Sequence, residues 1–322
     1  MANILEVVNL KKYFSTPKGL LHAVDDVSFS LNAGETLGIV GESGCGKSTL
    51  GRAILNLTEV TSGTVRFRGQ DITNVNRGPA FVEMRRKMQL IFQDPFSSLD
   101  PRICVFDAIA DPLRVHKVCK TEEELHTRVR ALMDRVGLAE RLTFSYPHEL
   151  DGGRRQRIGI ARALALKPEF IVCDEPVSAL DVSIQAQILN LMQDLQEDMG
   201  LTYLFITHDL SVVKHISNDI LVMYLGKMVE KCESEELFEN TLHPYTKALL
   251  AAIPIPEVRA RTKRELIRGE VSSPINPKPG CRFAPRCPYA TAACAEKTPE
   301  MEELLPKHFV ACHHAREING LK

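Results

Sequence analysis

The sequence lacks three features, each of which would have pointed to a different class of protein. Its 40 basic and 41 acidic residues nearly cancel, to a formal net charge of -1, so there is no strong electrostatic argument for binding nucleic acid. It has no apolar run approaching the roughly 18 residues that a bilayer-spanning helix needs. Its N-terminus lacks the basic and then apolar layout of a signal peptide. We therefore expect a chain that works in the cytosol or on the cytosolic face of a membrane.

Disulfide bonds are not expected either. The chain has nine cysteines, and in a cytosolic protein cysteines are more often free thiols or metal ligands than disulfides. At 322 residues, the chain is long enough for one large domain and a smaller one.

A glycine-rich stretch carries the clearest functional signal. Two glycines separated by four residues and followed by Lys and Ser fit the phosphate-binding loop, whose backbone N–H groups point at phosphate oxygens. The apolar run before it and the helix formers after it supply the strand, loop and helix that this chemistry requires. Lys47 is expected to reach the β- and γ-phosphates and Ser48 to bind magnesium; the alternative is a glycine-rich turn that matches by accident. The stretch consists of Gly41, Glu42, Ser43, Gly44, Cys45, Gly46, Lys47, Ser48 and Thr49.

Two adjacent carboxylates, Asp174 and Glu175, follow another apolar run at residues 170–173. A carboxylate pair at the end of a buried strand costs desolvation energy, so it is rarely found without a cation or a partner. In phosphate-loop enzymes the first such carboxylate holds magnesium and the second polarises the attacking water.

Several weaker signals follow in order along the chain. A Gln at the end of a strand can bind magnesium or orient water, and a glycine pair that opens a helix can cradle phosphate. Taken alone, each of these positions has an ordinary structural explanation, such as a plain loop-to-helix junction. The residues concerned are Gln93, Gly152, Gly153, Asp181 and His208.

Strands and helices alternate through most of the chain, which predicts a mainly parallel sheet with ligands at the carboxyl ends of its strands. Alternating apolar and polar residues within residues 1–40 predict an antiparallel portion before it. Residues 96–165 are predicted to be mostly helical. Within them, a capping box at Thr121 predicts a helix start and Gly137 its end.

Together, these motifs resemble those of the ATP-binding subunits of ABC transporters, over about residues 4–250. The resemblance implies an α/β P-loop NTPase with a RecA-like core, an antiparallel β-subdomain and an inserted helical subdomain at about residues 95–165. It also implies two cassettes that face each other head to tail, with ATP and Mg²⁺ between them.

The same resemblance implies a role for each motif residue. It implies that Phe14 or Tyr13 stacks on adenine, that Asp174 binds magnesium and that Glu175 is the catalytic base. It also implies that His208 senses the γ-phosphate, that Gln93 couples the site to the membrane subunits and that Asp181 lies at the dimer interface. The expected magnesium ligands are Ser48, Gln93 and Asp174, and the expected catalytic residues are Lys47, Gln93, Glu175 and His208.

One motif departs from the family pattern. The signature that usually reads Leu-Ser-Gly-Gly-Gln reads Leu-Asp-Gly-Gly-Arg here, with Asp151 in the serine position and Arg154 at the end. The serine normally donates to the γ-phosphate of the ATP on the opposite cassette, which an ionised Asp151 cannot do. Two unit charges about 4 Å apart, at an effective dielectric constant of about 20, repel by about 4 kcal/mol, a value that Arg154, Arg155 and magnesium would reduce. We therefore expect an asymmetric heterodimer in which the site built on this chain's own phosphate loop works and the reciprocal site is weakened.

Beyond residue 240 the resemblance narrows to the ATPase subunits of oligopeptide and dipeptide importers. It is carried by His-Pro-Tyr-Thr-Lys-Ala-Leu-Leu at residues 243–250, the proline-rich linker that follows, and the segments at residues 273–277 and 281–288. We accordingly expect a nucleotide-binding domain at residues 1–250 and a C-terminal extension at residues 251–322.

The extension contains four cysteines within 32 residues: Cys281, Cys287, Cys294 and Cys312. Their spacing is not that of the close pairs of a zinc ribbon or a bacterial ferredoxin, so spacing alone is a weak metal signal. An all-thiolate set suits an iron-sulfur cluster or zinc. The resemblance to the importer group favours 4Fe-4S, with zinc or simply reduced structural cysteines as the alternatives. His308, His313 and His314 are nearby candidate ligands that we do not expect to be used.

The leading hypothesis is an ATPase subunit that energises import of di- or oligopeptides. Its expected partners are a second ABC ATPase, two transmembrane permease subunits and, indirectly, an extracytoplasmic peptide-binding protein; no nucleic acid is expected. An importer of nickel or another small solute is an alternative, as is a soluble ABC ATPase that acts in translation or DNA repair. A non-hydrolysing redox-sensing module built around the cysteines conflicts with the intact Asp174 and Glu175 pair.

Overall fold

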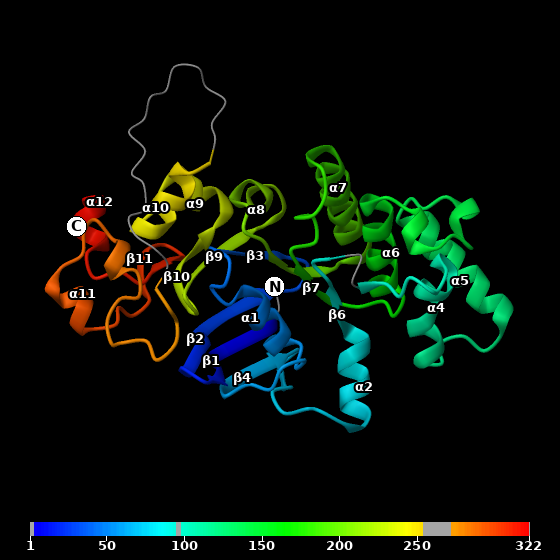
Figure 1. Cartoon of the computed structure of the whole chain (residues 1–322), viewed down its shortest axis with the longest axis horizontal. Helices are drawn as coiled ribbons and strands as arrows, with labels where there is room; N and C mark the ends of the chain where they lie inside the picture. Colours follow the sequence, from blue (N-terminus) through cyan, green and yellow to red (C-terminus); the bar gives the residue numbers. More distant parts are fainter. Residues whose placement is uncertain (1–2, 95–97, 254–271, 322) are drawn as a thin grey trace, which may run out of the picture. The chain divides into compact units, whose positions relative to one another are not determined.

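The computed structural model describes residues 3–94, 98–253 and 272–321. The chain folds as two compact units, each built from separate segments (Figure 1). The first unit takes residues 32–35 and 75–206, and the second takes residues 2–31, 36–74 and 207–322. Most of the linker predicted after residue 250 lies outside the described residues.

The first unit contains three parallel strands in the order β8-β7-β6. These are β6 (Met88–Ile91), β7 (Phe170–Asp174) and β8 (Thr202–Ile206). Every residue of β7 and β8 is buried, which explains why their sequences are continuous apolar runs without alternation. The parallel pairing predicted from the alternation of strands and helices is confirmed for these strands.

Helices make up most of the first unit, and α4, α5 and α6 pack on one another. The helices are α2 (Gly78–Lys87), α4 (Val105–Val115), α5 (Glu122–Arg135), α6 (Gly152–Leu164) and α7 (Val182–Met199), with single 3₁₀ turns at Glu140–Leu142 and Pro147–Glu149.

Local sequence signals set the ends of two of these helices. Thr121 caps α5 by accepting a hydrogen bond from the Glu124 N–H at 3.1 Å, as the capping box predicts. Helix α7 ends at Gly200, whose φ of 64° lies in the left-handed region that favours glycine. Apolar residues at helical spacing are buried on both helices, among them Val129 on α5 and Ile188 on α7.

The second unit contains two groups of strands. One has the order β2-β1-β4-β5, with antiparallel β1–β4 and β4–β5 pairs, which confirms the antiparallel portion predicted for the start of the chain. The other has the order β11-β12-β10-β9-β3, in which β3 and β9 are parallel and the other pairs antiparallel. The strands are β1 (Asn3–Thr16), β2 (Gly19–Asn32), β3 (Thr36–Val40), β4 (Ser62–Phe67), β5 (Gln70–Asp71), β9 (Asp219–Tyr224), β10 (Lys227–Glu233), β11 (Glu302–Leu305) and β12 (His308–Val310).

Short helices complete the second unit. They are α1 (Lys47–Ile54), α8 (Leu210–Ile216), α9 (Ser234–Glu239), α10 (Pro244–Ala251), α11 (Ala292–Glu296) and α12 (Ala315–Asn319), with a 3₁₀ turn at Ala284–Arg286.

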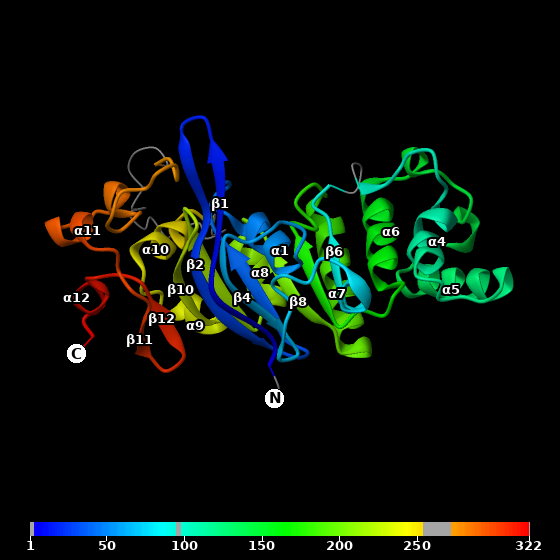
Figure 2. The same ribbon diagram turned by 90° about the horizontal axis from the view of Figure 1, so that it is seen from below.

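The C-terminal extension is part of the second unit, because its strand β12 pairs with β10 (Figure 2). The fully buried Glu230 of β10 joins the two segments: it accepts hydrogen bonds from the backbone N–H groups of Leu242 and His243, and contacts the His308 ring at 2.8 Å. A small apolar cluster of Leu242, Val310 and Ala315 packs beside this contact. His308 therefore serves the fold.

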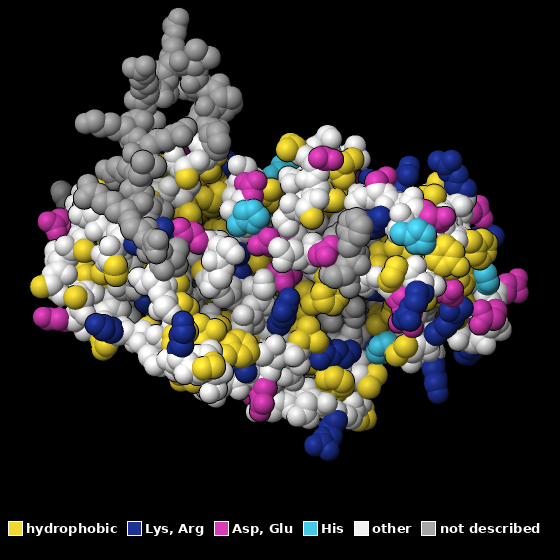
Figure 3. Space-filling model, viewed as in Figure 1, with side chains coloured by type: hydrophobic (Ala, Val, Ile, Leu, Met, Phe, Trp, Pro, Cys, Tyr) yellow, Lys and Arg dark blue, Asp and Glu magenta, His cyan; other side chains and the backbone are white. Residues whose placement is uncertain are grey.

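Basic and acidic side chains are interspersed over the face of the molecule that Figure 3 shows. This mixture agrees with the near-zero net charge of the sequence.

Two glycine substitutions in the first unit should change stability in opposite directions. Gly200→Ala should lower the free energy of unfolding by about 1 kcal/mol, because alanine is strained at a positive φ. Gly159→Ala should raise it by about 0.5 to 1 kcal/mol, since a Cβ at this position inside α6 meets nothing within 4 Å and alanine favours the helix. Urea unfolding followed by far-UV circular dichroism measures both effects, as the chain has no tryptophan. Shifts of the same sign would contradict the assigned backbone conformations.

Candidate functional site

The glycine-rich loop lies in the second unit, between β3 and α1. Its path passes very close to neighbouring backbone. A Cβ at Gly41 would stand 2.2 Å from the Met223 carbonyl oxygen, and one at Gly46 would stand 1.9 Å from that of Ala23. Both glycines also have positive φ, 154° and 105°. No other residue type fits either position, so the spacing of the two glycines is a requirement of this fold.

Helix α1 begins at Lys47, directly after Gly46. The N-terminus of the helix, with the positive end of its dipole, therefore lies at the loop, which is the arrangement that binds phosphate. Lys47 is buried, and its amine donates hydrogen bonds to the carbonyl oxygens of Gly41 at 2.7 Å and Glu42 at 3.1 Å. The loop carbonyls thus hold this cation within the loop.

His208 also lies in the second unit. The residue before it, Thr207, donates its N–H to the carbonyl oxygen of Ile39 at 3.1 Å. Since Ile39 stands two residues before Gly41, this bond places the chain at His208 beside the strand that leads into the loop. Asp209, on its other side, caps α8 by accepting from the Ser211 N–H at 2.8 Å.

The predicted adenine-stacking residues, Tyr13 and Phe14, are on β1 in the same unit. Tyr13 stacks on His22 at 3.9 Å between ring centroids, and its hydroxyl donates to Asp25 at 2.5 Å. Burial and the Asp25 carboxylate raise the pKa of Tyr13. Phe14 is 36% exposed, with the Lys12 amine over its ring.

Gln93, Asp174 and Glu175 belong to the first unit, and the structure brings two of them together. The Gln93 amide donates to the Glu175 carboxylate at 3.1 Å. Asp174, the last residue of β7, is 3% exposed, and Glu175 follows it with a φ of 48°. A non-glycine residue rarely has such a φ, and backbone of this kind is concentrated at functional sites.

Three hydrogen bonds keep the Glu175 backbone in this conformation. Its N–H donates to the Ile206 carbonyl oxygen at 2.9 Å, and its own carbonyl oxygen accepts from the N–H and the hydroxyl of Ser178 at 3.3 and 3.1 Å. The direction of the carboxylate is therefore set by the ends of two neighbouring strands.

The divergent signature opens α6 in the first unit. Asp151 caps the helix by accepting from the Arg154 N–H at 2.8 Å, and its second oxygen pairs with the Arg154 guanidinium at 3.3 Å. The guanidinium of Arg155 donates to the carbonyl oxygen of Pro147 at 2.5 Å. Arg154 thus compensates part of the Asp151 charge.

The glycine pair of the signature packs closely against the segment that contains Asp181. A Cβ at Gly152 would stand 3.0 Å from a methyl group of Leu180, and one at Gly153 would stand 2.7 Å from a methyl group of Ile184. Asp181 itself is exposed just before α7.

The four cysteines of the extension line one cavity in the second unit, together with Phe283 and His243. Cys281 donates its N–H to the carbonyl oxygen of Cys294 at 2.7 Å, which joins two of the cysteine segments. Burial raises the pKa of Cys281, Cys287 and Cys312, the last to about 11. All nine cysteines of the chain are free. Across the described ranges, however, no three His, Cys, Asp or Glu side chains are grouped closely enough to hold a metal ion.

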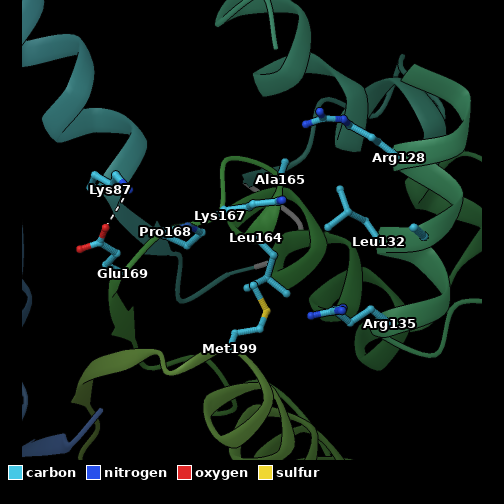
Figure 4. Close-up of a pocket in the computed structure, with 11 residues that line it drawn as sticks. Lys87, Arg128, Leu132, Arg135, Leu164, Ala165, Lys167, Pro168, Glu169 and Met199 are labelled. Carbon is cyan, nitrogen blue, oxygen red and sulfur yellow. Dashed lines mark hydrogen bonds and ion pairs between the residues drawn. The ribbon is translucent and has the colours of Figure 1, made fainter. Parts of the chain in front are cut away.

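A separate pocket in the first unit combines basic and apolar side chains from α2, α5, α7 and the end of α6 (Figure 4). Its basic residues are Lys87, Arg128, Arg135 and Lys167, and Lys87 pairs with Glu169 at 2.7 Å. None of the predicted site residues lines it.

Sequence reasoning missed three residues that contact the site, Tyr245 and the extension residues Arg282 and Arg286. Arg286 binds Glu42 of the loop, the Tyr245 hydroxyl accepts from the Glu42 N–H at 2.9 Å, and Arg282 binds Asp25. In the sequence, Arg282 and Arg286 stand next to Cys281 and Cys287, and this was the one signal that could have drawn attention to them. It does not identify their binding partners, which lie more than 200 residues away in the sequence.

Comparisons with known proteins identify related families and relatives. The profile of the ABC transporter family matches residues 24–178, and that of the oligopeptide/dipeptide transporter C-terminal region matches residues 229–294. The chain is 53% identical to the oligopeptide transport ATP-binding protein AppF of Bacillus subtilis, over 96% of this chain and 97% of that protein. It is 49% identical to the oligopeptide transport ATP-binding protein OppF of Salmonella typhimurium, over 96% and 95%.

Solved structures show the same fold. The ATP-binding cassette MJ0796, in a dimeric post-hydrolysis state with ADP and Pi, matches with a TM-score of 0.65 at 28% identity and covers 71% of this chain and 98% of that one. The cbiO1 subunit from Clostridium perfringens, part of the ABC transporter complex cbiONQ, matches with a TM-score of 0.66 at 27% identity, over 74% and 92%.

Among the described residues, no helix is both long and apolar enough to cross a bilayer. The similarity along nearly the whole length and the matched cassette fold identify the family. This chain belongs to the ATP-binding subunits of ABC transporters, in the group of oligopeptide transport ATP-binding proteins.

Proposed function

We propose that this chain is the ATP-hydrolysing subunit of an oligopeptide importer, attached to two membrane-spanning subunits on the cytoplasmic face of the membrane. One observation carries the proposal: the complete ordered set of ATP-site residues occurs in a chain that is 53% identical, over 96% of its length, to an oligopeptide transport ATP-binding protein. The solute itself contacts the membrane subunits and an extracytoplasmic binding protein, so the residues of this chain do not identify it.

The residues of the site have distinct tasks in this proposal. The loop amides and Lys47 bind the β- and γ-phosphates, which replace the loop carbonyls as partners of the Lys47 amine. Ser48, Gln93 and Asp174 hold Mg²⁺, whose charge offsets the negative charge on the transferred phosphoryl group. The donor set suits this ion, because Mg²⁺ prefers hydroxyl, amide and carboxylate oxygens.

Glu175 acts as the base that orients and deprotonates the attacking water. Its bond to Gln93 and its backbone contacts hold the carboxylate in one direction, and His208 contacts the γ-phosphate. Little covalent chemistry is required of the protein, so its contribution is mostly positioning and electrostatic stabilisation.

Removal of the base should abolish turnover and leave binding intact. Glu175→Gln should lower the ATP hydrolysis rate of the assembled transporter by about 100-fold or more, the contribution typical of a general base, because the amide cannot take a proton. Glu197→Gln, an exposed acid on α7, is the matched control and should leave the rate unchanged. A phosphate-release assay measures the rate, and a Glu175→Gln enzyme that keeps more than a tenth of it would argue against this base.

The second ATP-binding subunit of the transporter is proposed to be a different chain. Asp151 offers no hydrogen-bond donor to a phosphate when ionised, and its pairing with Arg154 offsets only part of its charge. A homodimer would contain this defect at both sites, whereas a heterodimer contains it at one. The site that uses this chain's Lys47 and Glu175 together with the partner's signature remains the working site.

Restoring the usual serine should activate the weakened site. Asp151→Ser keeps the helix cap, because serine is also a good N-cap residue, and it removes the charge that repels phosphate. The ATP hydrolysis rate of the assembled transporter should then rise by about twofold as the second site contributes. Asp134→Ser, at an exposed position on α5, is the control. An unchanged rate in Asp151→Ser would contradict the asymmetric heterodimer.

The four cysteines of the extension are proposed to hold a 4Fe-4S cluster, with zinc as the alternative. Support comes from the donor set: four partly or fully buried thiols line one cavity in a segment that matches the C-terminal region of these transporters. Burial raises the pKa of three of these thiols, and a bound cation would provide the charge that stabilises them as thiolates. The cluster would serve to cross-link the segments of the extension.

Metal analysis tests this assignment. Protein purified anaerobically should contain about four iron and four sulfide per chain, or about one zinc in the alternative. Cys294→Ser should lose the metal, while Cys104→Ser, in the first unit, should keep it. A chain without iron, sulfide and zinc would exclude both metals and leave four reduced structural cysteines.

A further inference from the structure

Two arginines of the extension, Arg282 and Arg286, reach from the cysteine segment toward the ATP site. Arg282 directly follows Cys281 and Arg286 directly precedes Cys287. Their side chains are only 9% and 7% exposed. The backbone between them is a tight turn, in which the N–H groups of Ala284 and Arg286 donate to the carbonyl oxygens of Cys281 and Phe283. Both guanidinium groups are thus largely buried and carried by a hydrogen-bonded turn.

Arg286 binds a residue of the phosphate loop. Its two terminal nitrogens donate to the two carboxylate oxygens of Glu42 at 2.7 and 3.0 Å. One of these nitrogens also donates to the Tyr224 hydroxyl at 3.2 Å. A two-pronged arginine–carboxylate pair of this kind is stronger and more directional than a single contact.

The charge of Glu42 makes this contact important. Glu42 follows Gly41 directly, so it stands in the loop that must receive a highly negative triphosphate. An unpaired carboxylate there would repel the phosphates, whereas a paired one does not. The backbone of Glu42 is held as well, since its N–H donates to Tyr245 and its carbonyl oxygen accepts from Lys47.

Arg282 anchors the same segment at a second place. It binds the Asp25 carboxylate, which also accepts from the Tyr13 hydroxyl, and it donates to the carbonyl oxygen of Leu225. The next residue, Gly226, donates its N–H to the carbonyl oxygen of Cys45 in the loop at 2.8 Å.

An aromatic cluster supports the turn between the two arginines. Phe283 packs against Tyr224 and Tyr245 at 5.3 and 5.4 Å between ring centroids, and Tyr224 packs against Tyr245 at 4.7 Å. Phe283 is 2% exposed and also lines the cysteine cavity. The position of Arg286 is therefore determined by the packing of the extension.

From these contacts we propose that Arg286 of the C-terminal extension is a positioning residue of the ATP site, which neutralises Glu42 and holds the phosphate loop in its nucleotide-binding form. The extension then contributes directly to ATP affinity. This inference rests on the ATP-binding function proposed above, and Arg286 acts through Glu42 without contact to the reacting atoms.

Equilibrium binding of MgATP to the full-length chain tests the proposal, with Glu175→Gln in every sample to prevent turnover. Arg286→Ala should weaken binding by about tenfold, because it leaves the Glu42 charge unpaired beside the phosphates. The double variant Arg286→Ala with Glu42→Gln should recover most of this loss, since the repelling charge is gone. Arg286→Lys keeps the positive charge and should bind within about threefold of the parent.

Arg66→Ala is the matched control, because Arg66 pairs with Glu6 at 3.0 Å elsewhere in the same unit, and it should leave affinity unchanged. Thermal unfolding identifies any variant that fails to fold, and the double variant still gives a result if Arg286→Ala alone does not. Binding by Arg286→Ala within twofold of the parent, or a loss that the double variant does not recover, would overturn the proposal. Failure of the parent itself to bind MgATP would instead overturn the proposed function.

Discussion

The close approach of backbone around the phosphate loop is the constraint on which the ATP site depends. The carbonyl oxygens of Ala23 and Met223 stand where a side chain at Gly46 or Gly41 would begin. Ala23 is on β2 and Met223 is on β9, far apart in the sequence. The pairing of β3 with β9 and the hydrogen bond from the Asp25 N–H to the Gly226 carbonyl oxygen bring these strands together. The loop is thus shaped by its surroundings, and the start of α1 and the buried Lys47 follow from that shape.

The carboxylates of the site form ion pairs or hydrogen bonds with neighbouring side chains. Three carboxylates of the predicted site have such a partner: Glu42 has Arg286, Glu175 has the Gln93 amide, and Asp151 has Arg154. The partners differ in strength. The Glu42 pair is partly buried and two-pronged, whereas the Asp151 pair is mostly exposed and formed within one turn of a helix, where such pairs contribute little. This difference is the physical basis for expecting one intact and one weakened ATP site.

The C-terminal extension belongs structurally to the nucleotide-binding unit. Its strand β12 continues the sheet that contains β3, its histidine His308 meets the buried Glu230, and its arginines meet Glu42 and Asp25. The cavity lined by four thiols is also lined by Phe283 and Ala284 of the same turn. A group bound in that cavity would therefore stiffen the segment that holds the phosphate loop.

The sequence by itself determined the local features: the glycine spacing of the loop, the apolar runs that became β7 and β8, the cap at Thr121, the stop at Gly200, and the order of motifs that identifies the family. These features can be read because each depends on residues within a few positions of one another. Only the tertiary structure decided that Gln93 meets Glu175, that Arg155 donates to Pro147, that four spaced cysteines line one cavity, and that Arg286 meets Glu42 across 244 residues. Such contacts arise from strand pairing and turn geometry far along the chain, and a sequence carries no local pattern that records which distant partner a buried charge will find.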